Sequence, residues 1–309
     1  MRGSPMAFDY ATISDLRTAE VVHAEYMRLL ADRNSLPNHP VFAVGYKDAT
    51  GLNSTTVKVG FVGLDGYDSM TAPGDGSAVG ATDLTDASGT VTIAGQRFRR
   101  DPTDLARMTD PGGNFSPARF ARDMVGAANA RLVDLVAALA SGFSTVVGTS
   151  GSDATLQNLL DCKRALNVAN ADGPLLGVFH PTQWADIMDD LTLNSGGAVQ
   201  WEPAAPALRA VLGNGYQGRL AGIDVYTTTR VGTANGSADR AGMVVAPGAI
   251  LWADAAPIVD DPSRQQVFGR VLFEMDRQAA SAITSFVGHY TVGVAEGLDA
   301  AGVALITDA

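Results

Sequence analysis

The feature that most constrains this chain is a run of 38 residues, from Val59 to Gln96, that contains no lysine or arginine. Its centre reads GLDGYDSMTAPGDGSAVGATDLTDASG. The strand-like runs TVKVGFVG and TVTIAGQRFRR precede and follow that centre, so we expect a long two-stranded excursion with an acidic tip. A lone hairpin is marginally stable in water, and loops of this length are usually functional or disordered. We therefore expect the excursion to lie on another subunit, which favours an assembly protein over a free-standing enzyme.

The composition is that of a folded protein with an acidic surface. Of its 309 residues, 46% are apolar and 18% are charged, which allows a sizeable core and more than one lobe. The formal net charge is −11, and an acidic surface repels the phosphates of nucleic acids. A sequence-reading DNA-binding protein is therefore excluded, although non-specific proximity to DNA through a local basic face stays open.

Neither membrane insertion nor secretion is predicted. No run approaches the roughly 18 apolar residues of a membrane span, and the N-terminal MRGSPMAFDYATISD lacks the apolar core of a signal peptide. We expect a soluble protein that is made in the cytoplasm. The single cysteine, Cys162, excludes an intrachain disulfide and is expected to be a small buried apolar residue.

Helical periodicity marks five stretches. Ser116-Pro117 predicts the start of a long helix that runs to about Ser141, with serine as the N-cap and proline at the first helical position. Its expected apolar stripe consists of Phe120, Met124, Ala127, Ala128, Leu132, Leu135, Val136 and Leu139. Other helices are expected over 13–33, from 152 to about 173, over 181–191 and over 207–212.

Apolar and alternating runs predict strands between and after these helices. We expect strands over 41–46, 175–179, 221–231 and 241–253, paired strands over about 267–307, and a loop over 192–206. Few of these strands are joined by regular crossover helices, so a doubly wound sheet is not expected. The predicted fold class is α+β.

No residue pattern predicts a catalytic, cofactor or metal site. The G-x-G-x-x-G match at 213–218 follows a helix-like run and precedes a strand, which reverses the context of a dinucleotide-binding motif. A nucleophile elbow would need glycine at position 152, where serine stands. The four histidines are far apart in the sequence and none has a nearby cysteine, so a zinc site is unsupported: His23, His39, His180 and His289. We predict no cofactor and no enzyme activity.

The order of these segments resembles that of tailed-bacteriophage major capsid proteins of the Hong Kong 97-type fold. An arm over about 1–40, an extended loop over about 50–100 and a long helix over 116–141 follow one another. The resemblance then continues through the compact region LLDCKRALNVANADGPLLGVFHPTQWADIMDDL, the strands AGIDVYTTTRV and AGMVVAPGAILWADAAP, and the ending FEMDRQAASAITSFVGHYTVGVAEGLDAAGVALITD. It covers nearly the whole chain.

The resemblance implies an N-terminal arm, an extended β-hairpin loop, a long spine helix, and peripheral and axial domains. It divides the chain into the arm and first strand (1–49), the extended loop (50–101), the spine helix with the start of the peripheral domain (102–151), a mainly axial domain (152–255) and a return to peripheral-domain strands (256–309).

The implied function is that of a major capsid protein, a structural component of the virion. Its copies would form hexamers and pentamers of an icosahedral shell around packaged double-stranded DNA, assembled in the host cytoplasm without a membrane partner. Because the arm is short, the resemblance implies a separate scaffolding protein or a missing scaffolding segment. A portal protein and an optional decoration protein are the other expected partners. The loop has no lysine beyond Lys58 at its base, so no lysine–asparagine crosslink is expected.

In this arrangement the loop of one subunit would lie over the spine helix and peripheral domain of the next. The candidate subunit-contact residues are three loop aspartates and six arginines: Asp65, Asp68, Asp75, Arg97, Arg99, Arg100, Arg119, Arg122 and Arg131.

Two other classes stay open. An encapsulin-like compartment would share the fold but enclose enzymes, and a neighbouring cargo gene would favour it, whereas terminase, portal and protease genes would favour the phage. A cytoplasmic enzyme with an acidic lid loop would instead form a discrete oligomer with ligand-dependent thermal shifts.

Overall fold

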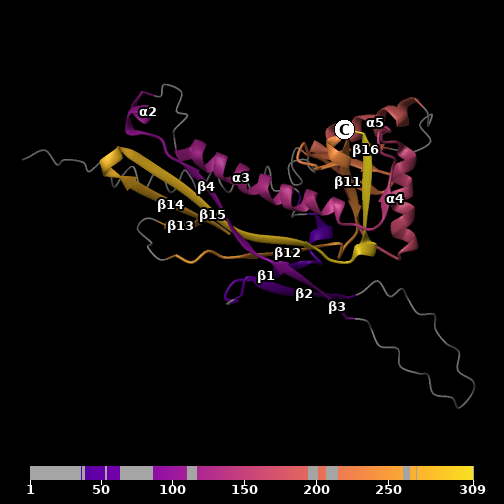
Figure 1. Cartoon of the computed structure of the whole chain (residues 1–309), viewed down its shortest axis with the longest axis horizontal. Helices are drawn as coiled ribbons and strands as arrows, with labels where there is room; N and C mark the ends of the chain where they lie inside the picture. Colours follow the sequence, from indigo (N-terminus) through magenta and orange to yellow (C-terminus); the bar gives the residue numbers. More distant parts are fainter. Residues whose placement is uncertain are drawn as a thin grey trace, which may run out of the picture. The chain divides into compact units, whose positions relative to one another are not determined.

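The structure is a computed structural model of the 309-residue chain. It describes residues 36, 39–52, 54–62, 86–109, 117–193, 201–206, 215–259, 265–268 and 270–308. The chain forms two compact units (Figure 1 labels their elements). The first unit comprises Met1–Arg33, Gly95–Asn129 and Ala256–Thr291, and the second comprises Asn34–Ala94, Ala130–Ala255 and Val292–Ala309.

The first unit contains an antiparallel sheet and a helix that packs on it. Its strands are β4 (Ala94–Arg100), β13 (Gln265–Phe268), β14 (Val271–Gln278) and the larger part of β15 (Ile283–Glu296). Its helices are α2 (Asp104–Met108) and the first part of α3 (Pro117–Ala138). β14 pairs with β13 and β15, and β4 also pairs with β15.

Aromatic side chains form the core of the first unit. The ring centroid of Phe120 on α3 lies 4.9 Å from that of Phe286 and 5.5 Å from that of Phe273. Phe98 on β4 approaches Phe120 from another side, with ring centroids 5.8 Å apart. Met124 lies four residues after Phe120, on the same helical face, and is buried in the same cluster. The apolar face of the helix, which repeats every 3.6 residues, thus packs against the apolar face of the strands, which repeats every two residues.

The second unit contains an eight-stranded mixed sheet. Its strands run in the order β5 (Val146–Val147), β16 (Gly302–Asp308), β11 (Asp239–Val245), β6 (Leu175–Phe179), β9 (Ile223–Thr227), β8 (Tyr216–Leu220) and β7 (Trp201–Pro203), with β10 (Thr233–Ala234) paired to β11. All five residues of β6 are buried. β6 is a central strand with both faces covered, and such strands have continuous apolar sequences. Figure 1 shows β11 and β16 side by side, with α4 next to β16.

Two helices accompany this sheet. They are α4 (Leu156–Val168), which packs on β16, and α5 (Pro181–Leu193), which packs on α4. Gln183 of α5 is fully buried, and its amide donates hydrogen bonds to the carbonyl oxygens of Arg240 and Leu305 and to the hydroxyl of Thr307. Its own carbonyl oxygen accepts from the His180 backbone, so this buried amide is fully used in fixing α5 to β11 and β16.

The second unit also holds the base of the predicted excursion. β1 (Tyr46–Asp48) pairs in parallel with β12 (Ile250–Ala255), and β12 pairs in turn with β15. β2 (Thr56–Val62) and β3 (Asp86–Thr92) form a separate antiparallel pair, which we call the ribbon. Residues 63–85, which include Asp65, Asp68 and Asp75, lie outside the described residues.

The long predicted helix is confirmed. α3 spans Pro117–Ala138 and continues as a 3-10 turn over Leu139–Ser141. Within the predicted stripe four side chains are buried, namely Phe120, Met124, Leu132 and Val136. Val133 and Ala137 are buried as well, whereas Leu135 is only half-buried, so the buried stripe of the second part is rotated slightly from the predicted one.

Two predicted boundaries near helix starts are wrong. The strand expected over 41–46 is replaced by a 3-10 helix, Pro40–Phe42, because proline fixes a helix-compatible φ and His39 supplies the cap. The helix expected from position 152 begins at Leu156, where Thr155 and Asn158 form a reciprocal capping box. The N-cap that forms is therefore the one that has a partner three residues later.

Several strand boundaries also differ from the prediction. The loop expected over 192–206 contains β7, the run 241–253 is divided by a turn in which Gly248 has φ +89°, and TVTIAGQRFRR is divided at Ile93 into β3 and β4. β8 was not predicted. The strand LLGVF and the helix at Pro181 are confirmed. The helices expected over 13–33 and 207–212 fall outside the described part of the chain.

Candidate assembly surfaces

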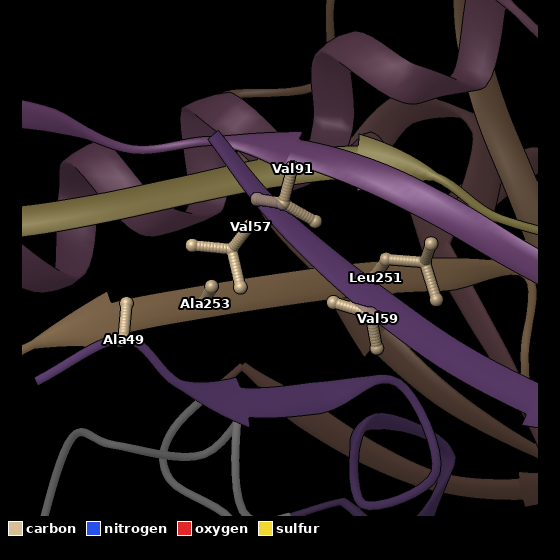
Figure 2. Packing of buried hydrophobic residues seen from close by; sticks show 6 residues of the cluster. All are labelled: Ala49, Val57, Val59, Val91, Leu251 and Ala253. Carbon is tan, nitrogen blue, oxygen red and sulfur yellow. The ribbon is translucent and has the colours of Figure 1, made fainter. Parts of the chain in front are cut away.

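One face of the ribbon is buried in an apolar cluster. Val57 and Val59 on β2 and Val91 on β3 point toward Leu251 and Ala253 on β12 (Figure 2), and Ala49 completes the cluster. We call these six residues the ribbon base. Alternate residues of β2 are buried here, since Val57 and Val59 are 1% and 2% exposed. This end of the ribbon is therefore anchored in the unit by apolar packing.

The opposite face of the ribbon is polar and exposed. Its cross-strand pairs are Thr56 with Thr92, Lys58 with Thr90, and Gly60 with Ser88. Lys58 is the only charged residue among these six. Within the described part of the chain, β2 and β3 form a sheet of two strands, so each has an outer edge without a strand partner. A small-residue polar face with open edges can accept another chain.

The arginines predicted on β4 are placed in three different environments. Arg99 Nε donates to Asp101 Oδ1 (2.8 Å), and its Nη2 donates to the Ser285 hydroxyl (3.3 Å). Arg100 places its guanidinium 4.7 Å from the ring centroid of Phe98 and 3.9 Å from the Asp123 carboxylate. Arg97 is exposed on the other face of the strand from Phe98.

One carboxylate on α3 is approached by two arginine side chains, one from α3 and one from β4. Arg119 Nε lies 3.7 Å from Asp123, which is the same carboxylate that Arg100 approaches. Two guanidinium groups thus approach the same carboxylate. Arg131 is exposed further along the helix. Arg122 belongs to α3, but its side chain lies outside the described residues, as do the three loop aspartates.

The described residues of the two units differ in net charge. The described residues of the first unit include eight arginines, no lysine and five acidic residues. Those of the second unit include eight basic and sixteen acidic residues. Among the described residues, the negative charge is therefore concentrated in the second unit.

A buried polar cluster was not predicted from the sequence. Asp224 on β9 accepts hydrogen bonds from Arg219 Nε (2.9 Å), Arg219 Nη2 (3.0 Å) and the Tyr216 hydroxyl (3.0 Å), and His39 Nε2 lies 3.1 Å from its Oδ2. We call these four residues the Asp224 cluster. The one sequence signal for it is an aspartate between the apolar residues of AGIDVY. The cluster joins the segment before β1 to the β8–β9 hairpin.

The electrostatics of this cluster keep the carboxyl ionised. Burial alone would raise the pKa of Asp224, but the hydrogen bonds from His39 and Arg219, the Arg219 charge and the Tyr216 hydroxyl hold that pKa well below its usual range. Burial and the adjacent Asp224 charge raise the pKa of the Tyr216 phenol to about 12. Both groups are therefore fixed in one protonation state near neutral pH.

The cluster lacks what acid–base catalysis requires. Both imidazole nitrogens of His39 are occupied, because Nε2 contacts Asp224 and Nδ1 accepts from the Val41 backbone N–H (3.4 Å). His39 is only 4% exposed, so a substrate has no access to it. The cluster is a structural connection.

Other candidate chemistry is equally sparse in the described part of the chain. Burial raises the pKa of the Cys162 thiol to about 12, which keeps it protonated and unreactive. No group of three or more potential ligand side chains that could hold a metal ion is found among the described residues. Gly215 directly precedes β8 and Gly218 lies within that strand, so no helix N-terminus follows them. None of the described helices is both long and apolar enough to span a bilayer.

Comparison with known proteins gives a consistent answer at the level of fold. No family model matches the sequence, and no curated protein does. Among solved structures, the capsid of cyanophage P-SCSP1u matches with a TM-score of 0.58 and 13% identity over 85% of each chain. The capsid of Ralstonia phage GP4 matches with a TM-score of 0.56 and 11% identity, over 86% of this chain and 85% of that one.

The chain has a phage capsid fold. The predicted Hong Kong 97-type architecture and the α+β class are thereby confirmed. The capsid fold is shared with an encapsulin complex from Synechococcus elongatus, which matches with a TM-score of 0.57 and 13% identity over 87% of this chain and 88% of that one. At these identities the likeness is one of fold. The five-part division of the chain and the nine subunit-contact candidates stay predictions.

Proposed function

We propose that this chain is the major capsid protein of a tailed bacteriophage. Its copies self-assemble into hexamers and pentamers that tile an icosahedral shell around packaged double-stranded DNA. The observation that carries the proposal is the match to phage capsid structures over about 85% of the chain. The neighbours are shell proteins, and no catalytic arrangement is found among the described residues.

The ribbon supports contact between copies. Its base is buried on β12, whereas its exposed face and open edges have no partner strand in the described part of the subunit. We propose that the acidic loop beyond it, with Asp65, Asp68 and Asp75, lies over α3 and β4 of a neighbouring copy. Arg97, Arg100 and Arg119 form the proposed matching surface, on which Arg97 is exposed.

Such contacts need not be strong individually. One exposed ion pair contributes at most about 1 kcal/mol. In a ring or shell every copy both donates and receives the same heterologous contact, so modest energies sum over the closed assembly.

Electron microscopy tests the proposal directly. The protein would be purified after expression alone and after expression with its neighbouring genes, since a separate scaffolding protein and a portal protein are expected partners. Closed shells of uniform diameter, or rings of five and six subunits, would support the proposal. Particles of a few subunits under every condition would contradict it and favour an enzyme with an acidic lid loop.

A deletion sharpens this test. Replacing residues 65–83 by a short Gly/Ser turn keeps every strand pair of the ribbon, including Val62 with Asp86. We expect a folded subunit that forms no shells, because the loop that reaches the neighbour is gone. Normal shells from this deletion would refute the role of the loop while leaving the capsid proposal intact.

The encapsulin match favours one alternative, a shell that encloses protein cargo. The two functions differ in what the purified particle contains. Nuclease-protected double-stranded DNA inside shells made in the native host would indicate a virion, with the chain located in the capsid after assembly in the host cytoplasm. A co-purifying enzyme and no DNA would indicate a compartment.

A further inference from the structure

The ribbon meets the rest of the second unit at an unusually tight backbone crossing. β3 ends at Thr92 and β4 begins at Ala94, so Ile93 alone separates two strands that have different partners. β3 pairs with β2, whereas β4 pairs with β15. Ile93 N donates to the Thr55 carbonyl oxygen (2.8 Å), which closes the ribbon at this point.

Gly293 of β15 lies directly against this crossing. A Cβ atom at position 293 would overlap the carbonyl oxygen of Thr92, and it would lie 2.7 Å from the Thr92 carbonyl carbon and 3.0 Å from the Ile93 Cα. Gly293 does not have a positive φ, so its backbone conformation suits any residue. Glycine is required here for space alone.

The atoms that crowd Gly293 cannot move by a rotamer change. They belong to the backbone, and Thr92 is held in register opposite Thr56. One residue earlier, Val91 is fully buried in the ribbon base. A side chain at 293 must therefore displace β3 as a strand, because close-packed interiors transmit strain rather than absorb it.

We propose that Gly293 is a positioning residue for assembly, which sets the direction in which the ribbon leaves β15. This inference rests on the proposed shell function. Seven residues of β2 at about 3.3 Å each form a lever of roughly 20 Å, so a small displacement at the crossing grows along the ribbon toward the neighbouring copy. The contact with a neighbouring copy depends on where the ribbon points, whereas the core of a single subunit does not.

The experiment compares Gly293→Ala with Gly60→Ala. Gly60 lies on β2 of the same ribbon, and a Cβ atom there would meet nothing within 4 Å. Shells would be examined by electron microscopy, and the subunit by circular dichroism and hydrogen exchange of the β3 amides. We expect Gly60→Ala to form wild-type shells and Gly293→Ala to lose shells of wild-type diameter while remaining folded. Identical shells from both variants would overturn the proposal.

A second substitution distinguishes a changed ribbon direction from general damage to the subunit. Ile93→Gly gives the connection between β3 and β4 more freedom, so the double variant should recover shells that Gly293→Ala loses. If Gly293→Ala fails to fold, Ile93→Gly alone decides the matter: shells of mixed diameter support the proposal, and uniform wild-type shells overturn it. Failure of the wild-type chain to form shells under any condition would instead reject the proposed function.

Discussion

Two attachments within the second unit can be compared, the ribbon base and the Asp224 cluster. Valines, alanines and a leucine hold the ribbon on β12, with no hydrogen bond between side chains among them. In the Asp224 cluster, one buried carboxylate joins His39 to Tyr216 and Arg219 through directional bonds. Apolar packing is non-directional and tolerates small shifts, whereas an unmatched buried polar group is costly. We therefore expect substitutions in the ribbon base to cost less stability than substitutions in the Asp224 cluster.

The largest expected effect comes from breaking the Asp224 cluster. Asp224→Asn keeps the shape but removes the charge, and its NH2 group must face a donor of Arg219, His39 or Tyr216. We expect a loss of about 3 kcal/mol in the free energy of unfolding, measured by urea titration. Asp161→Asn, on the surface of α4, is the control and should change stability by less than about 0.5 kcal/mol. Equal stabilities of the two variants would remove the contrast between the attachments.

The same cluster predicts how stability depends on pH. The pKa of Asp224 is lowered in the folded protein, so its contribution is present above the unfolded value of about 3.9 and is lost as pH falls through the folded pKa. The stability difference between wild type and Asp224→Asn should therefore shrink below about pH 4. Urea titrations of both proteins at neutral and acid pH measure it. A difference that is constant with pH would show that the charge of Asp224 is not involved.

A smaller effect is expected at the ribbon base. Val91→Thr keeps the volume but buries a hydroxyl among apolar side chains, which should cost about 1–2 kcal/mol. Thr90→Val makes the opposite exchange at the neighbouring exposed position and should be nearly neutral. Thermal unfolding of both variants tests whether one face of the ribbon is buried and the other exposed. Similar losses of stability for both variants would mean that the two faces are not distinct.

The smallest effect concerns a single exposed arginine. Arg97→Gln should leave subunit stability unchanged and weaken each contact between copies by less than about 1 kcal/mol. The midpoint concentration for assembly should rise, and the rise should be larger at low salt because screening weakens surface charge interactions. Light scattering at two ionic strengths measures this. Unchanged assembly would remove Arg97 from the proposed contact surface, and loss of subunit stability would place it in the fold instead.

The sequence predicted elements whose causes are local. The start of α3 follows from Ser116-Pro117, and β6 follows from the apolar run LLGVF between a helix stop and a proline. The Asp224 cluster was missed because His39 and Asp224 are 185 positions apart, and neither has a local pattern that names its partner. The division of TVTIAGQRFRR at Ile93 was missed because both halves alternate like one strand. The candidate contact arginines could be listed, but their partners would belong to another copy, which no periodicity within one chain specifies.

The position of β16 in the eight-stranded sheet has a consequence for the order of synthesis. β16 pairs with β11 on one side and β5 on the other, yet it is made after every other strand of that sheet. While a ribosome is still extending the chain through residues 302–308, β11 lacks its long partner and the sheet is incomplete. Under the proposed shell function, this fold would keep a chain out of a growing shell until residues 302–308 have been made.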